Sequence, residues 1–219
     1  MNKFAMQIAA ARGLLNWNQK QLAERAGVSQ RTIQNAEDGA SISRPVSDQI
    51  FKAFGDAGVE FLPGPGVRMK PSEVIELTGE TAYRDFLDDI FETVEDLDNP
   101  EILITGAKEP HPEDEPDKWT ALQLHIYRLQ SAGITERILI EEGDTNFAAP
   151  IHWYRWLPPE FFNRVAFQCY GNKLALTSWS PPARVLIIND PLWASTMRSL
   201  FDFVWDRALT PSTEGRDGS

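Results

Sequence analysis

Two short amphipathic segments separated by a glycine and a serine constrain the fold of this chain more than any other feature of its sequence. Residues 19–39 read QKQLAERAGVSQRTIQNAEDG, with apolar positions at helical spacing on both sides of Gly27. Gly27 suits a helix end with positive φ, and the Ser29 hydroxyl can cap the free N–H groups of a following helix. The segment therefore predicts two short helices joined by a tight turn.

The second of these helices has two chemically different faces. On a wheel of about 100° per residue, its polar positions fall within one arc of about 140°. The polar arc holds Gln30, Arg31, Gln34, Asn35 and Asp38, and the opposite arc holds Thr32, Ile33 and Ala36. Glutamine and asparagine can bond adenine through two contacts, and arginine can do the same to guanine, so the polar arc is suited to reading base edges in a DNA major groove. The alternative is an ordinary solvated helix face.

The same residues resemble a known family of DNA-binding domains. The matching positions are Gln19, Leu22, Ala23, Ala26, Gly27, Val28, Ser29, Thr32, Ile33, Glu37 and Gly39. Their types and spacing are similar to the phage-repressor/Cro helix-turn-helix family, also called XRE-like, over residues 4–62. The resemblance implies a bacterial transcription regulator, such as a repressor, whose four- or five-helix bundle binds double-stranded operator DNA as a homodimer.

The resemblance also implies roles for individual residues. Gln19 would contact phosphate at the start of the first motif helix, and Arg44, in the loop after the second, would contact the DNA backbone from the other side. Base reading is assigned to Gln30, Arg31, Gln34 and Asn35, next to the capping Ser29. Arg12 and Glu37 would form an internal ion pair. The loop ASISRP at 40–45 lacks the lysines often found there, so DNA affinity should be modest or depend strongly on dimerisation.

Charge divides the chain into two parts. The whole chain carries a net charge of −11, which alone argues against nucleic acid. Residues 1–70, however, hold nine Lys and Arg against six Asp and Glu, whereas residues 71–219 hold twelve against twenty-six. We expect a helix-turn-helix domain at 1–69 that ends in an extended segment at 58–69, an acidic effector or dimerisation domain at 70–209, and a disordered tail at 210–219.

The acidic part predicts an α/β or α+β domain. Its pattern opens with an amphipathic helix at 81–97, followed by a buried strand at 101–106 and a solvated acidic, proline-rich loop at 109–117. A helix at 119–131 precedes the remaining elements. Strands are expected at 136–141, 151–157, 164–170, 173–179 and 184–188, and a helix at 191–208.

Two features of the acidic part bear on ligands. Tyr154 and Trp156 would share one face of the strand at 151–157 with His152, while Arg155 lies on the other. These aromatics and the arginine could line a pocket for a small-molecule or protein effector, or simply pack against the helices at 81–97 and 191–208. The order of elements from 81 to 208 also resembles effector modules related in fold to phospholipase D. That family's catalysis uses a His-x-Lys pair, and no histidine here has a lysine two residues later.

Other chemistry is not indicated. The sequence shows no metal-binding Cys/His cluster, no phosphate-binding glycine loop and no Gly-x-Ser-x-Gly elbow, so we expect no enzyme, metal or cofactor. Cys169, the one cysteine, should be a buried apolar residue, and without signal or membrane-spanning patterns a cytoplasmic location is expected. Two alternatives stay open: an antitoxin or immunity-type protein whose acidic domain binds a basic partner while its DNA-binding domain autoregulates, and an enzyme with a DNA-targeting domain.

Overall fold

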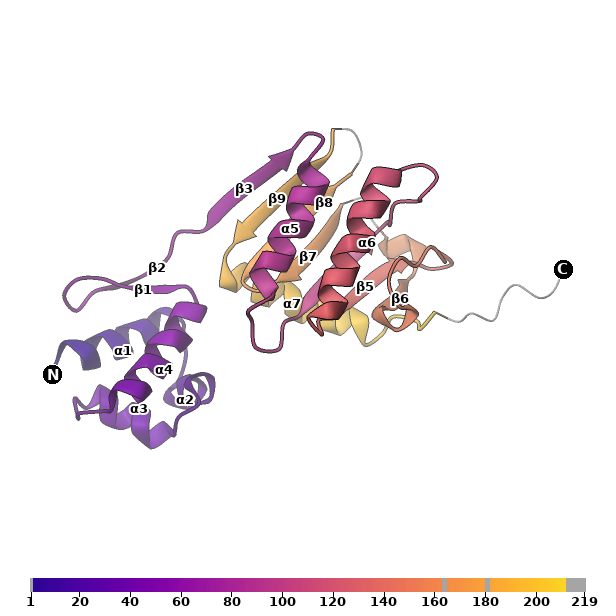
Figure 1. Cartoon of the computed structure of the whole chain (residues 1–219). Coiled ribbons are helices and arrows are strands. Elements are labelled where there is room, and N and C mark those ends of the chain that lie inside the picture. The colour runs from indigo at the N-terminus through magenta and orange to yellow at the C-terminus, as the bar shows by residue number, and fades with distance from the viewer. Residues whose placement is uncertain (1, 163–164, 180–181, 212–219) are drawn as a thin grey trace. The chain divides into compact units, whose positions relative to one another are not determined.

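The chain divides into two compact units. The computed structural model describes residues 2–162, 165–179 and 182–211, and its units are Met1–Ser72 and Glu73–Ser219. Figure 1 shows the helices and strands of both units.

Unit 1 is a bundle of helices closed by a small hairpin. Its helices are α1 (Lys3–Leu14), α2 (Gln19–Ala26), α3 (Gln30–Glu37) and α4 (Arg44–Asp56), followed by strands β1 (Val59–Phe61) and β2 (Val67–Met69). Each helix supplies fully buried side chains to one apolar core, among them Ile8, Leu22, Ile33, Ile50 and Phe54. Burial of this kind stabilises a unit by about 1.5–3 kcal/mol for each large apolar side chain.

The hairpin of unit 1 is held against the first helix. β1 and β2 pair antiparallel, with Val59 opposite Met69. The buried Gln7 side chain of α1 donates its Nε2 hydrogens to the carbonyls of Leu62, Gly64 and Gly66, at 3.2, 2.9 and 3.2 Å. These bonds satisfy turn carbonyls and fix the hairpin at the end of the bundle.

Unit 2 is built on a seven-stranded mixed sheet of order β3-β9-β8-β7-β4-β5-β6. Its strands are β3 (Glu73–Thr78), β4 (Ile102–Ala107), β5 (Glu136–Glu141), β6 (Tyr154–Leu157), β7 (Ala166–Tyr170), β8 (Lys173–Ser178) and β9 (Arg184–Asn189). β4, β5 and β6 run parallel to one another, and the other neighbouring pairs are antiparallel. Short 3-10 turns at Ile151–Trp153 and Pro159–Phe161 flank β6.

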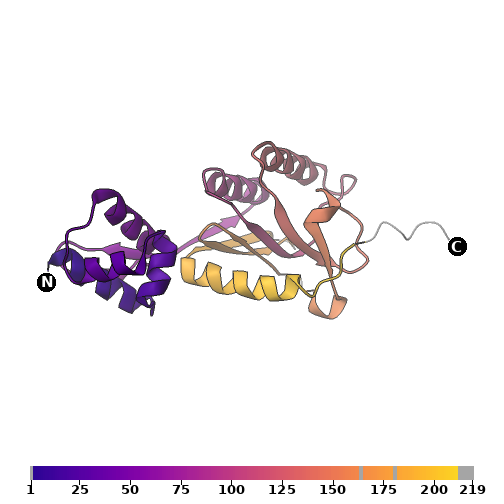
Figure 2. The same cartoon turned by 90° about the horizontal axis from the view of Figure 1, so that it is seen from below.

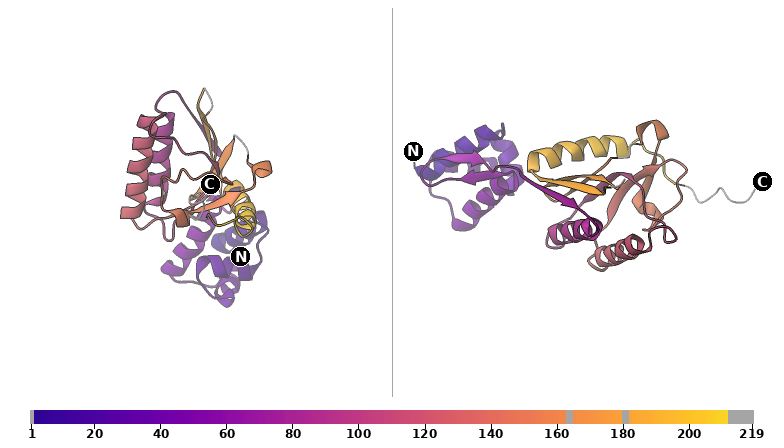
Figure 3. Two further views of the ribbon diagram at one scale, coloured as in Figure 1. Left: turned by 90° about the vertical axis from the view of Figure 1, so that its right-hand side faces the viewer. Right: turned by 90° about the horizontal axis from the view of Figure 1, so that it is seen from above.

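Helices cover both faces of this sheet. α5 (Ala82–Val94) and α6 (Pro116–Ser131) pack on one face, and α7 (Pro191–Trp205) packs on the other (Figures 2 and 3). Alternation along the strands separates two cores. In β4, Ile102 belongs to the core under α5 and α6, whereas Leu103 belongs to the core under α7. The expected helical bundle and α/β or α+β domain are therefore present.

Four details differ from the sequence-based expectations. Unit 2 opens with strand β3 and not with the helix at 81–97, because β3 adds to the sheet edge beside β9. Residues 151–153 form a 3-10 turn, so the strand expected at 151–157 is only β6. The segment 109–117 is not wholly a solvated loop, since Pro110 is buried and α6 already begins at Pro116. The segment 58–69, which was expected to be extended, folds back on itself as the β1-β2 hairpin.

Two further expectations concern burial and membranes. Cys169 is fully buried in β7, and this burial raises the pKa of its thiol to about 11, in line with a buried apolar role. Most of the predicted tail lies outside the described residues. Over the described part of the chain, no helix has the length and apolar character needed to cross a membrane.

Candidate nucleic-acid interface

The turn between α2 and α3 has the geometry that the sequence predicts. Gly27 ends α2 with φ 64°, in the left-handed region that favours glycine. Ser29 precedes α3, and its Oγ accepts the backbone N–H of Thr32 at 3.1 Å. This cap is worth about 0.5–2 kcal/mol to a helix of this kind. Local signals alone therefore place the start of α3.

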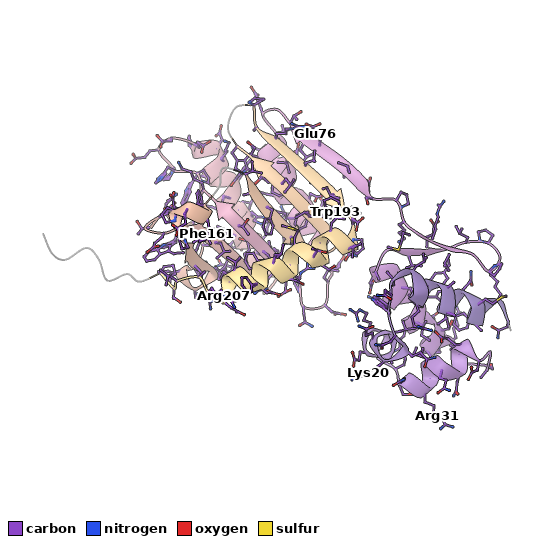
Figure 4. All side chains as sticks on the ribbon, turned by 180° about the vertical axis from the view of Figure 1, so that it is seen from behind. Lys20, Arg31, Glu76, Phe161, Trp193 and Arg207 are labelled. Atoms are coloured by element: carbon purple, nitrogen blue, oxygen red, sulfur yellow. The ribbon has the colours of Figure 1, made fainter. Side chains whose placement is uncertain are left out.

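The outer face of α3 is polar and free of the core. Gln30, Arg31, Gln34 and Asn35 are all exposed, as is Ser29, whereas Ile33 and Ala36 have no exposed surface. The Arg31 side chain points away from the bundle (Figure 4). Four hydrogen-bonding side chains thus project from two turns of one helix, and a helix of this size fits a DNA major groove.

An ion-pair network beneath α3 fixes its position. The Glu37 carboxylate accepts hydrogen bonds from Arg12 Nε at 2.8 Å and Arg12 Nη2 at 3.2 Å. Arg12 Nη1 also donates to the carbonyl of Trp17 at 2.9 Å. The Glu37 side chain is 11% exposed and that of Arg12 26%, so the pair is partly desolvated. The ion pair implied by the family resemblance is present and joins α1 to α3.

Gln19 is part of this network. Its Nε2 donates to Glu37 Oε2 at 2.8 Å, so this side chain is turned toward the interior of the unit. Gln19 is also the first residue of α2, whose N-terminus is closed by a capping box between Asn18 and Gln21. A phosphate contact from Gln19 would then use its backbone N–H or the second amide hydrogen.

Arg44 lies elsewhere than expected. It is the first residue of α4 and not part of the preceding loop, because Pro45 suits the first turn of a helix. Its side chain is 93% exposed, with Nε 3.9 Å from Asp48 Oδ2. The N-cap residue Ser43 makes no side-chain cap bond, so the first turn of α4 presents N–H groups and a cation together.

Tyr154, Arg155 and Trp156, which could line a pocket, do not lie together on one face of the sheet. Tyr154 is buried in the core under α5 and α6, and Trp156 packs against the same core. Arg155 points to the other face of the sheet, where its guanidinium lies 4.6 Å from the Trp205 ring centroid. Strand alternation separates Arg155 from the two aromatic side chains, and the contacts observed are those of packing against the two cores.

A partly buried carboxylate, that of Glu109, lies beside Tyr154. The Tyr154 hydroxyl and the Ala148 backbone N–H both donate to Glu109. Burial raises the pKa of the Glu109 carboxyl to about 7, against the opposing effect of the hydrogen bonds from Tyr154 and Ala148. Burial also raises the pKa of Tyr154. Sequence reasoning missed Glu109 because it assigned the whole acidic segment to solvent.

Comparison with known proteins supports the assignment of unit 1. Residues 8–57 match the family model described as helix-turn-helix. The match spans the core of unit 1, including all of α2, α3 and α4. Unit 1 is therefore a helix-turn-helix domain of the XRE-like type, and it supports a DNA-binding regulator. No curated protein matches the chain.

Three solved structures that are similar to the chain share 11–13% identity with it. The phospholipase D family member Nuc from Salmonella typhimurium is 13% identical (TM-score 0.46), covering 65% of this chain and 100% of its own. NucT from Helicobacter pylori is 12% identical (TM-score 0.46), covering 64% and 100%. TrmBL2, an archaeal chromatin protein, is 11% identical (TM-score 0.41), covering 64% and 55%. The first names the family that the order of elements in the acidic part resembles. Scores this low carry no argument about function.

Proposed function

We propose that this protein is a transcription regulator that binds an inverted-repeat operator as a homodimer. Gln30, Arg31, Gln34 and Asn35 read base edges in the major groove, and Arg44 contacts phosphate together with the first turn of α4. The observation that carries the proposal is the exposed polar face of α3. This helix is capped by Ser29 and lies within the residues that match the helix-turn-helix family model. A dimer would place its two α3 helices about one turn of DNA apart, or a multiple of this.

The charge distribution supports this division of labour. Unit 1 holds the nine Lys and Arg counted above, while unit 2 carries most of the acidic residues. Lys and Arg side chains that contact phosphates release counterions from DNA, and this release favours binding. We therefore assign DNA binding to unit 1. We assign effector sensing or assembly to unit 2 and no catalytic role.

Self-association has support from α7. Leu192, Trp193, Leu200 and Phe203 are each 54–65% exposed, and they lie within one arc of about 100° on that helix. Figure 4 shows Trp193 near the start of α7. Soluble monomers rarely expose a contiguous apolar stripe of this kind, whereas a second copy related by a two-fold axis would cover it.

The first test is selection of bound sequences from a random DNA pool at stated salt. The full chain should select an inverted repeat, and a chain ending at Ser72 should bind single half-sites more weakly. Selection of no sequence by either chain would contradict the proposal. A basic protein captured by unit 2, without any selected sequence, would instead favour the antitoxin-like alternative that the acidic charge of unit 2 keeps open.

A second test addresses the dimer. The double variant Leu200→Glu and Phe203→Glu should convert a dimer to a monomer in sedimentation equilibrium, because it places charge in the apolar stripe. Leu124→Glu with Tyr127→Glu is a matched control on exposed positions of α6. If the control dissociates the dimer and the α7 variant does not, α7 is not the surface that pairs.

A further inference from the structure

A large cavity lies between the sheet of unit 2 and the helices α5 and α6. Its volume is about 810 Å³, and its lining comes from β4, β5, β7, β8 and both helices. Small-molecule sites in proteins commonly have this size. Lys108, His111, Asp114 and Glu115, all between β4 and α6, and Glu141 on β5 are exposed lining residues, whereas other lining residues, such as Glu136 and Thr177, are buried.

Some polar atoms of buried side chains in this cavity make no hydrogen bond within the described part of the chain. Both ring nitrogens of His125 on α6, Oε1 of Gln168 on β7 and Oγ1 of Thr177 on β8 make no hydrogen bond. These side chains belong to residues only 2%, 8% and 1% exposed. Buried polar atoms are nearly always satisfied, so a group of them lining one cavity indicates that a ligand completes their hydrogen bonds.

The charge of the cavity selects the ligand. Its described lining carries five carboxylates and one lysine, of which Glu136 is buried and Glu109 is partly buried. Glu136 is 4% exposed, and its Oε1 lies 3.5 Å from His125 Nε2. A phosphate or carboxylate ligand would meet like charges in a low-dielectric space, whereas a cation would be attracted.

One wall of the cavity is aromatic. Tyr83 on α5 and Trp179 after β8 meet edge to face, with centroids 4.9 Å apart, and Phe86 lies 6.2 Å from Trp179. Aromatic faces bind organic cations and apolar ring systems. The apolar wall therefore complements the carboxylates and fits a ligand that has both an apolar body and a positive charge.

We propose that this cavity is a binding site for a small organic amine that carries an apolar body. The protonated nitrogen lies near Glu136 and Gln168 Oε1 and hydrogen-bonds the Thr177 hydroxyl, and the apolar body packs on Tyr83, Phe86 and Trp179. The site is separate from the DNA-reading face of unit 1, so its test needs no DNA.

The test uses three ligands that share an indole ring and differ in charge. Tryptamine is a cation, tryptophol is neutral and indole-3-acetate is an anion. Titration calorimetry with the full chain at about pH 8 keeps tryptamine protonated. Tryptamine should bind with a Kd about tenfold or more below that of tryptophol, and indole-3-acetate should bind most weakly. 2-Phenylethylamine, which also joins an aromatic ring to an amine, serves as a further probe.

Two near-isosteric variants localise the binding. Glu136→Gln removes the interior charge, and Thr177→Val removes an unpartnered hydroxyl, so each should raise the Kd of tryptamine about tenfold or more. Thr177→Val should also raise the thermal midpoint of the free protein, because the lost hydroxyl has no partner. Glu142→Gln, an exposed glutamate outside the cavity, is the charge-matched control and should leave the Kd unchanged.

Three results would overturn the proposal. The first is the absence of saturable binding of both tryptamine and 2-phenylethylamine at about 10 mM, a concentration far above the Kd of a specific site. The second is indole-3-acetate binding as tightly as tryptamine. The third is an equal loss of affinity in Glu142→Gln and in the cavity variants.

Discussion

At the scale of single residues, exposure separates side chains that are free to read DNA from those that hold the domain together. Arg31 and Glu37 lie on the same short helix, yet Arg31 is exposed while Glu37 is held by Arg12 and Gln19. Substitution of the first should change DNA recognition alone, and substitution of the second should change stability.

Arg31→Ala should weaken operator binding by about 1–3 kcal/mol and relax sequence preference at one base pair, because arginine bonds guanine through two contacts. The measurement is competition binding against operator variants at fixed salt. Arg184→Ala removes an exposed arginine of unit 2, paired with Glu76, and serves as the control. Equal weakening for all sequences would make Arg31 a phosphate contact.

Glu109 gives the stability of unit 2 a dependence on pH. Burial raises its pKa from 4.5 to about 7, with Glu136 and Asp144 also raising it and the bonds from Tyr154 and Ala148 opposing. The folded state therefore keeps the Glu109 proton up to a higher pH than the unfolded state does. Stability from this group is fully present below pH 4.5 and is lost as the pH rises to about 7, by at most about 3 kcal/mol.

Glu109→Gln should flatten this pH dependence, because glutamine does not titrate. Urea unfolding of unit 2 at several pH values between 4.5 and 7 measures it. Glu113→Gln, an exposed neighbour in the same segment, is the control and should retain the wild-type profile. If the free energy of unfolding of Glu109→Gln varied with pH as that of the wild type does, other groups would cause the pH dependence.

At the scale of elements, the Arg12, Gln19 and Glu37 network joins α1, α2 and α3. Glu37→Gln keeps the size of the side chain but removes the charge that Arg12 faces, and should destabilise unit 1 by about 1.5–3 kcal/mol. Glu24→Gln breaks only an exposed pair with Lys20, at 3.8 Å, and should cost less than about 0.5 kcal/mol. If urea unfolding gave the same loss of free energy for Glu37→Gln and Glu24→Gln, the network would add nothing to the stability of unit 1.

Elements with local signals could be predicted from the sequence, and those with distant partners could not. The turn at Gly27, the cap at Ser29 and the polar face of α3 depend on neighbouring residues, and each was predicted. β3 was missed as a strand because its partner β9 begins more than one hundred residues later. Glu109 was missed because its burial depends on Tyr154, which lies 45 positions away. The cavity in unit 2 likewise combines side chains from six separate elements.

At the scale of the whole molecule, each unit has a core built from its own residues. The core of unit 1 includes Leu22 and Phe54, and the main core of unit 2 includes Ile138 and Tyr154. We therefore expect two unfolding transitions. Leu22→Ala should lower the stability of the first by about 2–5 kcal/mol, and Ile138→Ala should do the same to the second alone. A chain ending at Ser72 should keep a folded, dispersed NMR spectrum.

Operator DNA offers the sharpest test of this independence. A ligand that binds only the folded state stabilises the domain it contacts by RT ln(1 + [L]/Kd), which is about 2.7 kcal/mol at one hundred times the Kd. DNA should therefore raise the first transition by about this amount and leave the second in place, since the reading face lies entirely on unit 1. If both transitions rose together, unfolding of the two units would be coupled. With such coupling, a ligand bound in the cavity of unit 2 could change the affinity of α3 for its operator, because linkage between two sites is reciprocal.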